Sequence, residues 1–181
     1  YVGYLFAGGE STAATAKSVE MDGNGDYLSL AASSDLSGGT NLASDPFTLE
    51  FWIKPQPWYT NACLVLQNAG YWIHKQGSNF KMSLYNVSGT NYDLVTTTEI
   101  PPAGCWTHVA VVKLAENNGG TNPVKMFFNG NEVSNSSSGE VNYTWPGNAI
   151  LIGSDGSNDF NGSISNFRFV KGTAVYSSSF S

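Results

Sequence analysis

The stretch FTLEFWIKP, residues 47–55, alternates strictly between apolar and other side chains. Phe47, Leu49, Phe51 and Ile53 fall on one side, and Thr48, Glu50, Trp52 and Lys54 fall on the other. Successive side chains of a β-strand point to opposite faces of its sheet. The stretch therefore predicts a strand, Phe47–Lys54, whose odd-numbered side chains share one face of the sheet and whose even-numbered side chains share the other.

The same kind of short run, β-branched or aromatic and closed by Gly, Asn, Pro or Asp, recurs along the chain and is typical of strands. The other predicted strands are Ser18–Met21, Tyr27–Leu30, Cys63–Gln67, Tyr71–Lys75, Phe80–Tyr85, Tyr92–Thr97, Trp106–Leu114, Val124–Phe128, Ala149–Ile152 and Ser163–Val170. Asn129-Gly130 predicts a hairpin, since both residues tolerate positive φ. WTHVAVVKL, residues 106–114, is apolar on both faces, as a central sandwich strand would be. No long apolar stripe of helical period interrupts this pattern, so we expect an all-β sandwich of two antiparallel sheets with almost no helix.

The composition excludes several classes of partner. Charged residues make up only 12% of the 181 residues, the formal net charge is −6, and Arg168 is the only arginine. Nucleic acids and anionic membrane surfaces require clustered Lys and Arg, so neither is expected as a partner. No apolar run approaches the roughly 18–20 residues that span a bilayer, so membrane insertion is not expected either.

Six segments in a fixed order carry a family resemblance: SVEMDGNGDYLSL, FTLEFWIKP, WTHVAVVK, VKMFFNGNEV, ILIGS and FNGSISNFRFVKGTAVY. Together they resemble the laminin-G-like, concanavalin A-like lectin/glucanase jelly-roll family. The two ends of the chain are similar to the version found in large surface proteins of marine bacteriophages and bacteria. The resemblance implies a jelly roll over residues 18–181, with residues 1–17 as an N-terminal extension or lead-in strand. It also implies binding of glycans or proteins, often with calcium, although some relatives are glycoside hydrolases.

The residues argue against catalysis. Glycoside hydrolysis needs a pair of carboxyl groups flanking the scissile bond, which relatives of this fold present as E-x-D-x-E on one strand. The nearest match is EMDGN, residues 20–24, which lacks the third acid and runs into glycines. His74 and His108 lie within predicted strands, where packing is the more common role for a lone histidine. The sequence therefore predicts a protein that is not an enzyme.

Two acidic loops each have two interpretations, a metal site or a turn. DGNGD, residues 22–26, places Asp22, Asn24 and Asp26 at alternate positions, and a second loop carries Asp155 and Asp159. Calcium binds six to eight oxygens from converging carboxylates and carbonyls. The alternative is a hairpin with a type I′ turn at Asn24-Gly25, whose aspartates cap nearby backbone N–H groups. Calcium at Asp22 and Asp26 is thus one of two interpretations.

Aromatic side chains are the candidates for glycan contact, because sugar C–H surfaces stack on rings. Trp58, Tyr59, Tyr143 and Trp145 lie on predicted loops, and Trp72 lies early in a strand where either role is open. Trp52 and Trp106 are expected in or near the core. The alternative for each loop aromatic is that it closes one end of the sandwich.

Cys63 and Cys105 are the only cysteines, and they are too far apart in the sequence for a zinc ribbon. They are either one disulfide across an end of the sandwich or two buried thiols.

Two functions from different classes follow. The first is a lectin-like binding module that recognises carbohydrate or another cell-surface ligand and acts in adhesion, outside a cell or on a virion surface. The second is a structural or decoration domain that contacts neighbouring chains of a virion or extracellular assembly and has no sugar site. An exposed aromatic cluster favours the first, and burial of that cluster between subunits favours the second.

Overall fold

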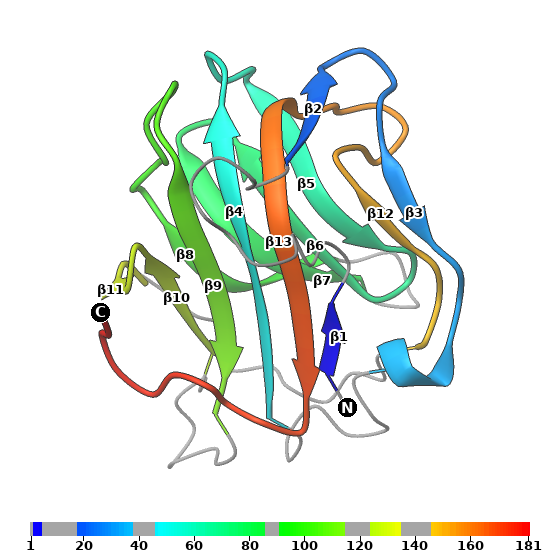
Figure 1. The fold of residues 1–181 in the computed structure, drawn as a ribbon, viewed down its shortest axis with the longest axis vertical. Helices are drawn as coiled ribbons and strands as arrows, with labels where there is room; N and C mark the ends of the chain where they lie inside the picture. The colour runs from blue at the N-terminus through cyan, green and yellow to red at the C-terminus, as the bar shows by residue number, and fades with distance from the viewer. Residues whose placement is uncertain (1, 5–17, 38–45, 86–90, 115–123, 135–145) are drawn as a thin grey trace.

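The computed structural model describes residues 2–4, 18–37, 46–85, 91–114, 124–134 and 146–181. They form two sheets packed face to face, and every strand pair described is antiparallel (Figure 1). The first sheet has seven strands. Six of them follow the order β1 (Val2–Tyr4), β13 (Asn161–Lys171), β4 (Phe47–Pro55), β9 (Thr107–Lys113), β10 (Val124–Phe128) and β11 (Asn131–Glu132), and the seventh, β2 (Val19–Asp22), also pairs with β13. The second sheet has six strands in the order β3 (Leu28–Leu30), β12 (Ile150–Ile152), β5 (Asn61–Gln67), β6 (Tyr71–Gln76), β7 (Asn79–Tyr85) and β8 (Asn91–Thr97). The predicted two-sheet jelly roll is confirmed, and the only helical turn among these residues is a 3₁₀ turn at Ser34–Leu36.

The core lies between the two sheets. Phe47, Leu49, Phe51 and Ile53 of β4 are at most 1% exposed and pack against inward side chains of the opposite sheet such as Tyr71. Burying a side chain of this size contributes roughly 1.5–3 kcal/mol to the free energy of unfolding. The alternation in FTLEFWIKP therefore positions β4 as predicted.

Part of the outer face of the seven-stranded sheet is covered, because Thr48 and Glu50 on this face are buried. The segment after β13, red in Figure 1, runs from the end of that strand back toward β11. Its side chains Ala174, Tyr176 and Phe180 cover a small second cluster formed by Ala110, Val112 and Phe127. This covering explains why WTHVAVVKL is apolar on both faces.

A buried ionic group lies under the same C-terminal segment. The Glu50 carboxylate pairs with the Arg168 guanidinium and lies 3.3 Å from Nε2 of His108. Burial acts to raise the pKa of Glu50, but hydrogen bonds from His108 and Tyr176 and the Arg168 charge outweigh it and hold the pKa below its ordinary value. Burial, together with the Glu50 carboxylate, raises the pKa of Tyr176 to about 12. His108 therefore has a packing and pairing role, as predicted for a histidine within a strand.

One predicted hairpin is confirmed and the other is wrong. Asn129 and Gly130 both have positive φ and join β10 to β11 with Phe128 opposite Asn131. Asn24, in contrast, has no positive φ, so Asn24-Gly25 is not a type I′ turn. The strands on either side of it pair in different sheets, β2 with β13 and β3 with β12, so DGNGD is a crossing between the sheets.

Other expectations concern the chain ends and two tryptophans. Trp52 and Trp106 are 38% and 41% exposed, so their expected place in or near the core is wrong. Val2–Tyr4 pair with β13 as an edge strand, and residues 5–17 lie outside the described part. Among the helices of the described residues, none is long and apolar enough to cross a membrane.

Candidate functional site

The predicted ligand-binding aromatics do not form one group. Trp58 is partly buried and packs against Phe80 and Phe160 of the core, with ring centroids 6.2 and 5.6 Å away. Its Nε1–H donates to the Pro101 carbonyl at 2.7 Å. Trp58 therefore closes one end of the sandwich, which corrects its expected place in a ligand site. Tyr59 is 47% exposed beside it, whereas Tyr143 and Trp145 lie outside the described residues.

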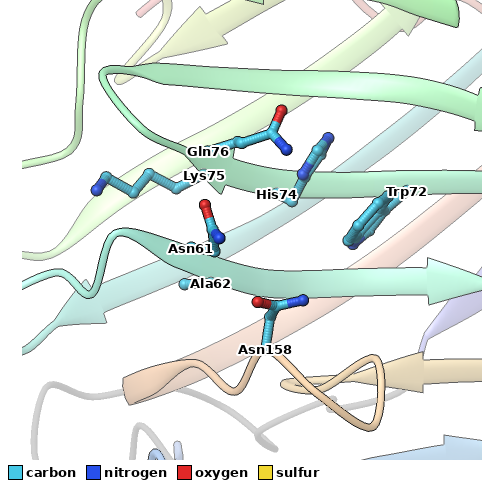
Figure 2. Close-up of a pocket in the computed structure, with 7 residues that line it drawn as sticks. All are labelled: Asn61, Ala62, Trp72, His74, Lys75, Gln76 and Asn158. Atoms are coloured by element: carbon cyan, nitrogen blue, oxygen red, sulfur yellow. The ribbon is translucent and has the colours of Figure 1, made fainter. Parts of the chain in front are cut away.

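Trp72 lies on the outer face of the six-stranded sheet. Tyr71 and Ile73 of β6 are wholly buried in the core, so the alternation of the strand turns Trp72 and His74 outward. The two rings stack, with centroids 4.1 Å apart and planes inclined by 8°. Figure 2 shows them side by side on the strand, with Gln76 next along it. The half-buried indole is thus held in a fixed orientation on the outer face of the sheet.

A groove surrounds this ring pair, and we call it the Trp72 groove. Its residues come from β5, β6 and the turns that follow β5 and β12: Asn61, Ala62, Leu66, Asn68, Trp72, His74, Lys75, Gln76, Asp155, Ser157 and Asn158. Asn158 reaches toward β5 from below in Figure 2. The part between Trp72 and the Asp155 loop has a volume of about 290 Å³, close to the lower limit of roughly 300 Å³ for small-molecule sites. The adjoining part lined by His74 is much smaller, with a volume of about 30 Å³. The lining combines a flat ring with amide and hydroxyl groups.

The loop that carries Asn158 is held rigidly by its own acids. The Asp155 carboxylate accepts from the backbone N–H groups of Ser157 and Asn158 at 2.9 and 2.7 Å. Asp159 accepts from the Ser154 hydroxyl and, at 2.8 Å, from the backbone N–H of Gly25 in the first acidic loop. These bonds fix one wall of the Trp72 groove and join the two acidic loops.

Asp22 and Asp26 also accept backbone N–H groups. Oδ1 of Asp22 accepts from Asn24 at 2.8 Å, and Oδ2 of Asp26 accepts from Asp22 at 3.2 Å. The capping role offered as the alternative to calcium is therefore confirmed, although the turn that they cap is not a hairpin. Within the described ranges, no three His, Cys, Asp or Glu side chains converge as a metal site requires. Calcium at Asp22 and Asp26 would need further oxygens from backbone carbonyls and amide side chains, and it stays a prediction.

A polar chain runs beside the groove across three strands. Nε2 of His74 lies 2.9 Å from Oγ of Ser83, which donates to Oδ1 of Asp93 at 2.6 Å. Oδ2 of Asp93 pairs with Nζ of Lys81 at 3.1 Å. Burial and then the Lys81 charge lower the pKa of His74 to about 4. His74 is therefore a buried, neutral, hydrogen-bonded histidine at physiological pH, in agreement with the packing role predicted for it.

The cysteines form no disulfide. Cys63 is fully buried in β5 beside the Trp72 indole, whereas Cys105 is exposed in the turn before β9. Burial and the nearby Asp155 carboxylate raise the pKa of the Cys63 thiol above its ordinary range. The predicted bridge is wrong, and the alternative of two buried thiols holds only for Cys63.

The sequence indicated Trp72 as a candidate but not the polar groups around it. His74, Ser83 and Asp93 come from three strands, and the sheet register alone makes them neighbours. The available signal was the period of two: Trp72 and His74 alternate with Tyr71 and Ile73, and Lys81 and Ser83 alternate with Phe80 and Met82. That signal shows which side chains of each strand face outward. It does not show which of them lie next to one another on neighbouring strands.

Comparison with known proteins shows the family. The family described as the concanavalin A-like lectin/glucanases superfamily matches residues 22–174. That match spans most of the 181 residues, so the chain belongs to this superfamily. A search of curated proteins found no match.

Several solved structures share the fold. Domain 4 of AbnA, a GH43 extracellular arabinanase from Geobacillus stearothermophilus, in complex with arabinotriose, is 21% identical with a TM-score of 0.62, and the match covers 96% of this chain and 77% of that chain. The botulinum neurotoxin serotype D ligand binding domain in complex with N-acetylneuraminic acid is 16% identical with a TM-score of 0.59, covering 100% and 43%. The serotype G binding domain is 12% identical with a TM-score of 0.56, covering 88% and 44%. This chain spans less than half of these two neurotoxin chains, and at such identities the likeness shows the fold alone.

Proposed function

We propose that this member of the concanavalin A-like lectin/glucanases superfamily is a non-catalytic carbohydrate-binding module whose ligand lies in the Trp72 groove. The observation that carries the proposal is the stacked Trp72–His74 pair, held on the outer face of the six-stranded sheet among amide and hydroxyl groups. The C–H face of a sugar ring packs on an aromatic face, and its hydroxyl groups bond to polar side chains at the rim. The groove supplies both kinds of contact.

The polar lining suits a ligand with many hydroxyl groups. Asn61, Asn68, Gln76 and Asn158 each carry a side-chain amide, which both donates and accepts. Lys75 is a wall residue, but its Nζ donates to the carbonyl oxygens of Tyr59 and Thr60 and points away from the groove in Figure 2. The side chains at the groove therefore favour hydrogen bonding over charge pairing.

The similar structures support a carbohydrate ligand as a class. One of them is in complex with arabinotriose and another with N-acetylneuraminic acid. Those sugars belong to those proteins and name no ligand for this chain. They do make arabinotriose and N-acetylneuraminic acid reasonable first probes, one neutral and one acidic.

The acids around the groove support binding without hydrolysis. A glycosidase needs one carboxyl group free as an acid and a second as nucleophile or base. Asp155 is engaged with the N–H groups of its own loop, and Asp93 accepts from Ser83 and Lys81. Both carboxylates are thus bonded to protein groups around the groove and stabilise the structure there. A module of this kind would serve recognition or adhesion outside a cell or on a virion surface.

A glycan array at pH 7 tests the proposal with three proteins: the unaltered chain, Trp72→Ala and Trp52→Ala. Trp52 is the matched control, because it is an outward strand tryptophan on the opposite sheet and is 38% exposed. We expect Trp72→Ala to abolish glycan binding and Trp52→Ala to leave it unchanged, with melting temperatures confirming that both variants fold. An unaltered protein that binds no glycan, but assembles with chains of a virion or surface structure, would replace this proposal with the structural role.

A further inference from the structure

The polar chain beside the Trp72 groove carries an inference about the ligand, and this inference rests on the proposed function. We infer that the chain Lys81–Asp93–Ser83–His74 fixes Nδ1 of His74 as a hydrogen-bond acceptor, so that the groove selects neutral sugars over acidic ones. A neutral sugar donates a hydroxyl proton to this atom. An ionised sugar carboxylate has no proton to donate.

The Lys81–Asp93 ion pair determines which atoms donate and which accept in this chain of hydrogen bonds. Asp93 is paired with Lys81 through Oδ2 at 3.1 Å. An ionised carboxylate accepts hydrogen bonds and donates none. The 2.6 Å contact between Oδ1 of Asp93 and Oγ of Ser83 therefore contains the only proton of the Ser83 hydroxyl.

The next bond continues this direction, with His74 as the donor. Because the Ser83 proton is committed to Asp93, Oγ accepts in its 2.9 Å contact with Nε2 of His74. Nε2 therefore carries a proton, and a neutral imidazole with a proton on Nε2 has a lone pair on Nδ1. Among the described residues, no group donates a hydrogen bond to Nδ1. The His74 side chain is only 4% exposed and lines the narrow part of the groove, whose volume of about 30 Å³ has room for a hydroxyl group but not for a sugar ring. The acceptor is thus available to one hydroxyl group of a ligand.

The charges around His74 keep it neutral and disfavour an anion. Lys81 faces it from β7, Asp93 from β8 and Asp155 from the loop before β13, while the Cys63 thiol beside it on β5 stays protonated. Burial and the Lys81 charge lower the pKa of His74 to about 4, so the ring remains an acceptor at neutral pH. The Lys81 charge is neutralised by Asp93. Lys75, on the groove wall, directs its Nζ to the carbonyl oxygens of Tyr59 and Thr60. An acidic sugar at His74 would therefore meet a lone pair and the Asp155 carboxylate.

Nitrogen NMR of the histidine side chains tests the tautomer. The protein has two histidines, so a His108→Gln variant assigns the His74 resonances. At pH 7 we expect a protonated, pyrrole-type Nε2 and an unprotonated, pyridine-type Nδ1. Ser83→Ala should remove this preference and give a mixture of tautomers, whereas Ser163→Ala on the opposite sheet should leave the spectrum unchanged. A proton on Nδ1 in the unaltered protein would overturn the inference.

An array of matched glycan pairs, galactose and galacturonic acid oligomers together with sialylated glycans and their asialo forms, tests the selectivity. We expect binding to neutral members only, and Ser83→Ala should weaken it roughly threefold to tenfold, as expected for one hydrogen bond. Preference for the acidic members would overturn this inference and leave the proposed function standing. Binding to no glycan at all would overturn both.

Discussion

His74 makes the stability of the protein depend on pH. Its pKa is about 4 in the folded state, against about 6.5 in the unfolded chain. Between pH 6.5 and pH 4 the His74 side chain is protonated in the unfolded state but still neutral in the folded state. The free energy of unfolding therefore falls as the pH drops through this range, and the stabilisation that the neutral folded His74 provides is lost below pH 4. The difference corresponds to a loss on the order of 3 kcal/mol. Urea denaturation at pH 7 and pH 4.5 should show a smaller pH-dependent loss for His74→Gln than for the unaltered protein, and equal losses would contradict the buried neutral state.

The two thiols should differ in reactivity. Cys63 is fully buried with a raised pKa, whereas Cys105 is exposed. Only the thiolate reacts with a disulfide reagent, so titration of the native, unreduced protein should detect one thiol and titration after denaturation should detect two. If titration after denaturation detected no thiol, the two cysteines would form a disulfide. Two reactive thiols in the native protein would instead contradict the burial of Cys63 beneath the Trp72 groove.

At the scale of elements, the C-terminal segment is fastened to the β10–β11 hairpin. The Phe180 backbone N–H donates to the Gly130 carbonyl at 2.8 Å, and a Cβ on Gly130 would collide with the Phe180 carbonyl oxygen. Gly130→Ala should therefore destabilise the protein by more than the roughly 1–2 kcal/mol expected for alanine in a left-handed conformation.

Gly77→Ala is the matched control, because Gly77 has a positive φ of 56° and open space around it. Thermal denaturation should show a larger loss of melting temperature for Gly130→Ala than for Gly77→Ala. Equal losses would mean that the C-terminal segment does not pack on this hairpin.

The two acidic loops should be stable without a metal. Asp22, Asp26, Asp155 and Asp159 all accept N–H groups of these loops, and these bonds require no cation. Adding a chelator should therefore leave both the melting temperature and glycan binding unchanged. A melting temperature that falls on chelation and recovers with calcium would show that the loops bind the ion after all.

At the scale of the whole molecule, the sequence predicted the sandwich because its inner faces follow a strict period of two. It did not predict the burial of Glu50, since the covering residues Tyr176 and Phe180 lie in a serine-rich segment without strand periodicity. It also did not assemble the Trp72 groove. His74, Ser83 and Asp93 become neighbours through the register of β6, β7 and β8, and a pattern within one strand carries no information on register.

The central claim is that a glycan lies against Trp72 on the outer face of the six-stranded sheet. The chain has five tryptophans, so its indole N–H resonances give five separable reporters in a nitrogen–proton NMR spectrum. Titration with a glycan found on the array, or with arabinotriose as the first probe, should shift the Trp72 resonance and leave Trp52, Trp58 and Trp106 unchanged. A glycan that binds and shifts any other indole while Trp72 stays still would contradict the account and place the site elsewhere on the molecule.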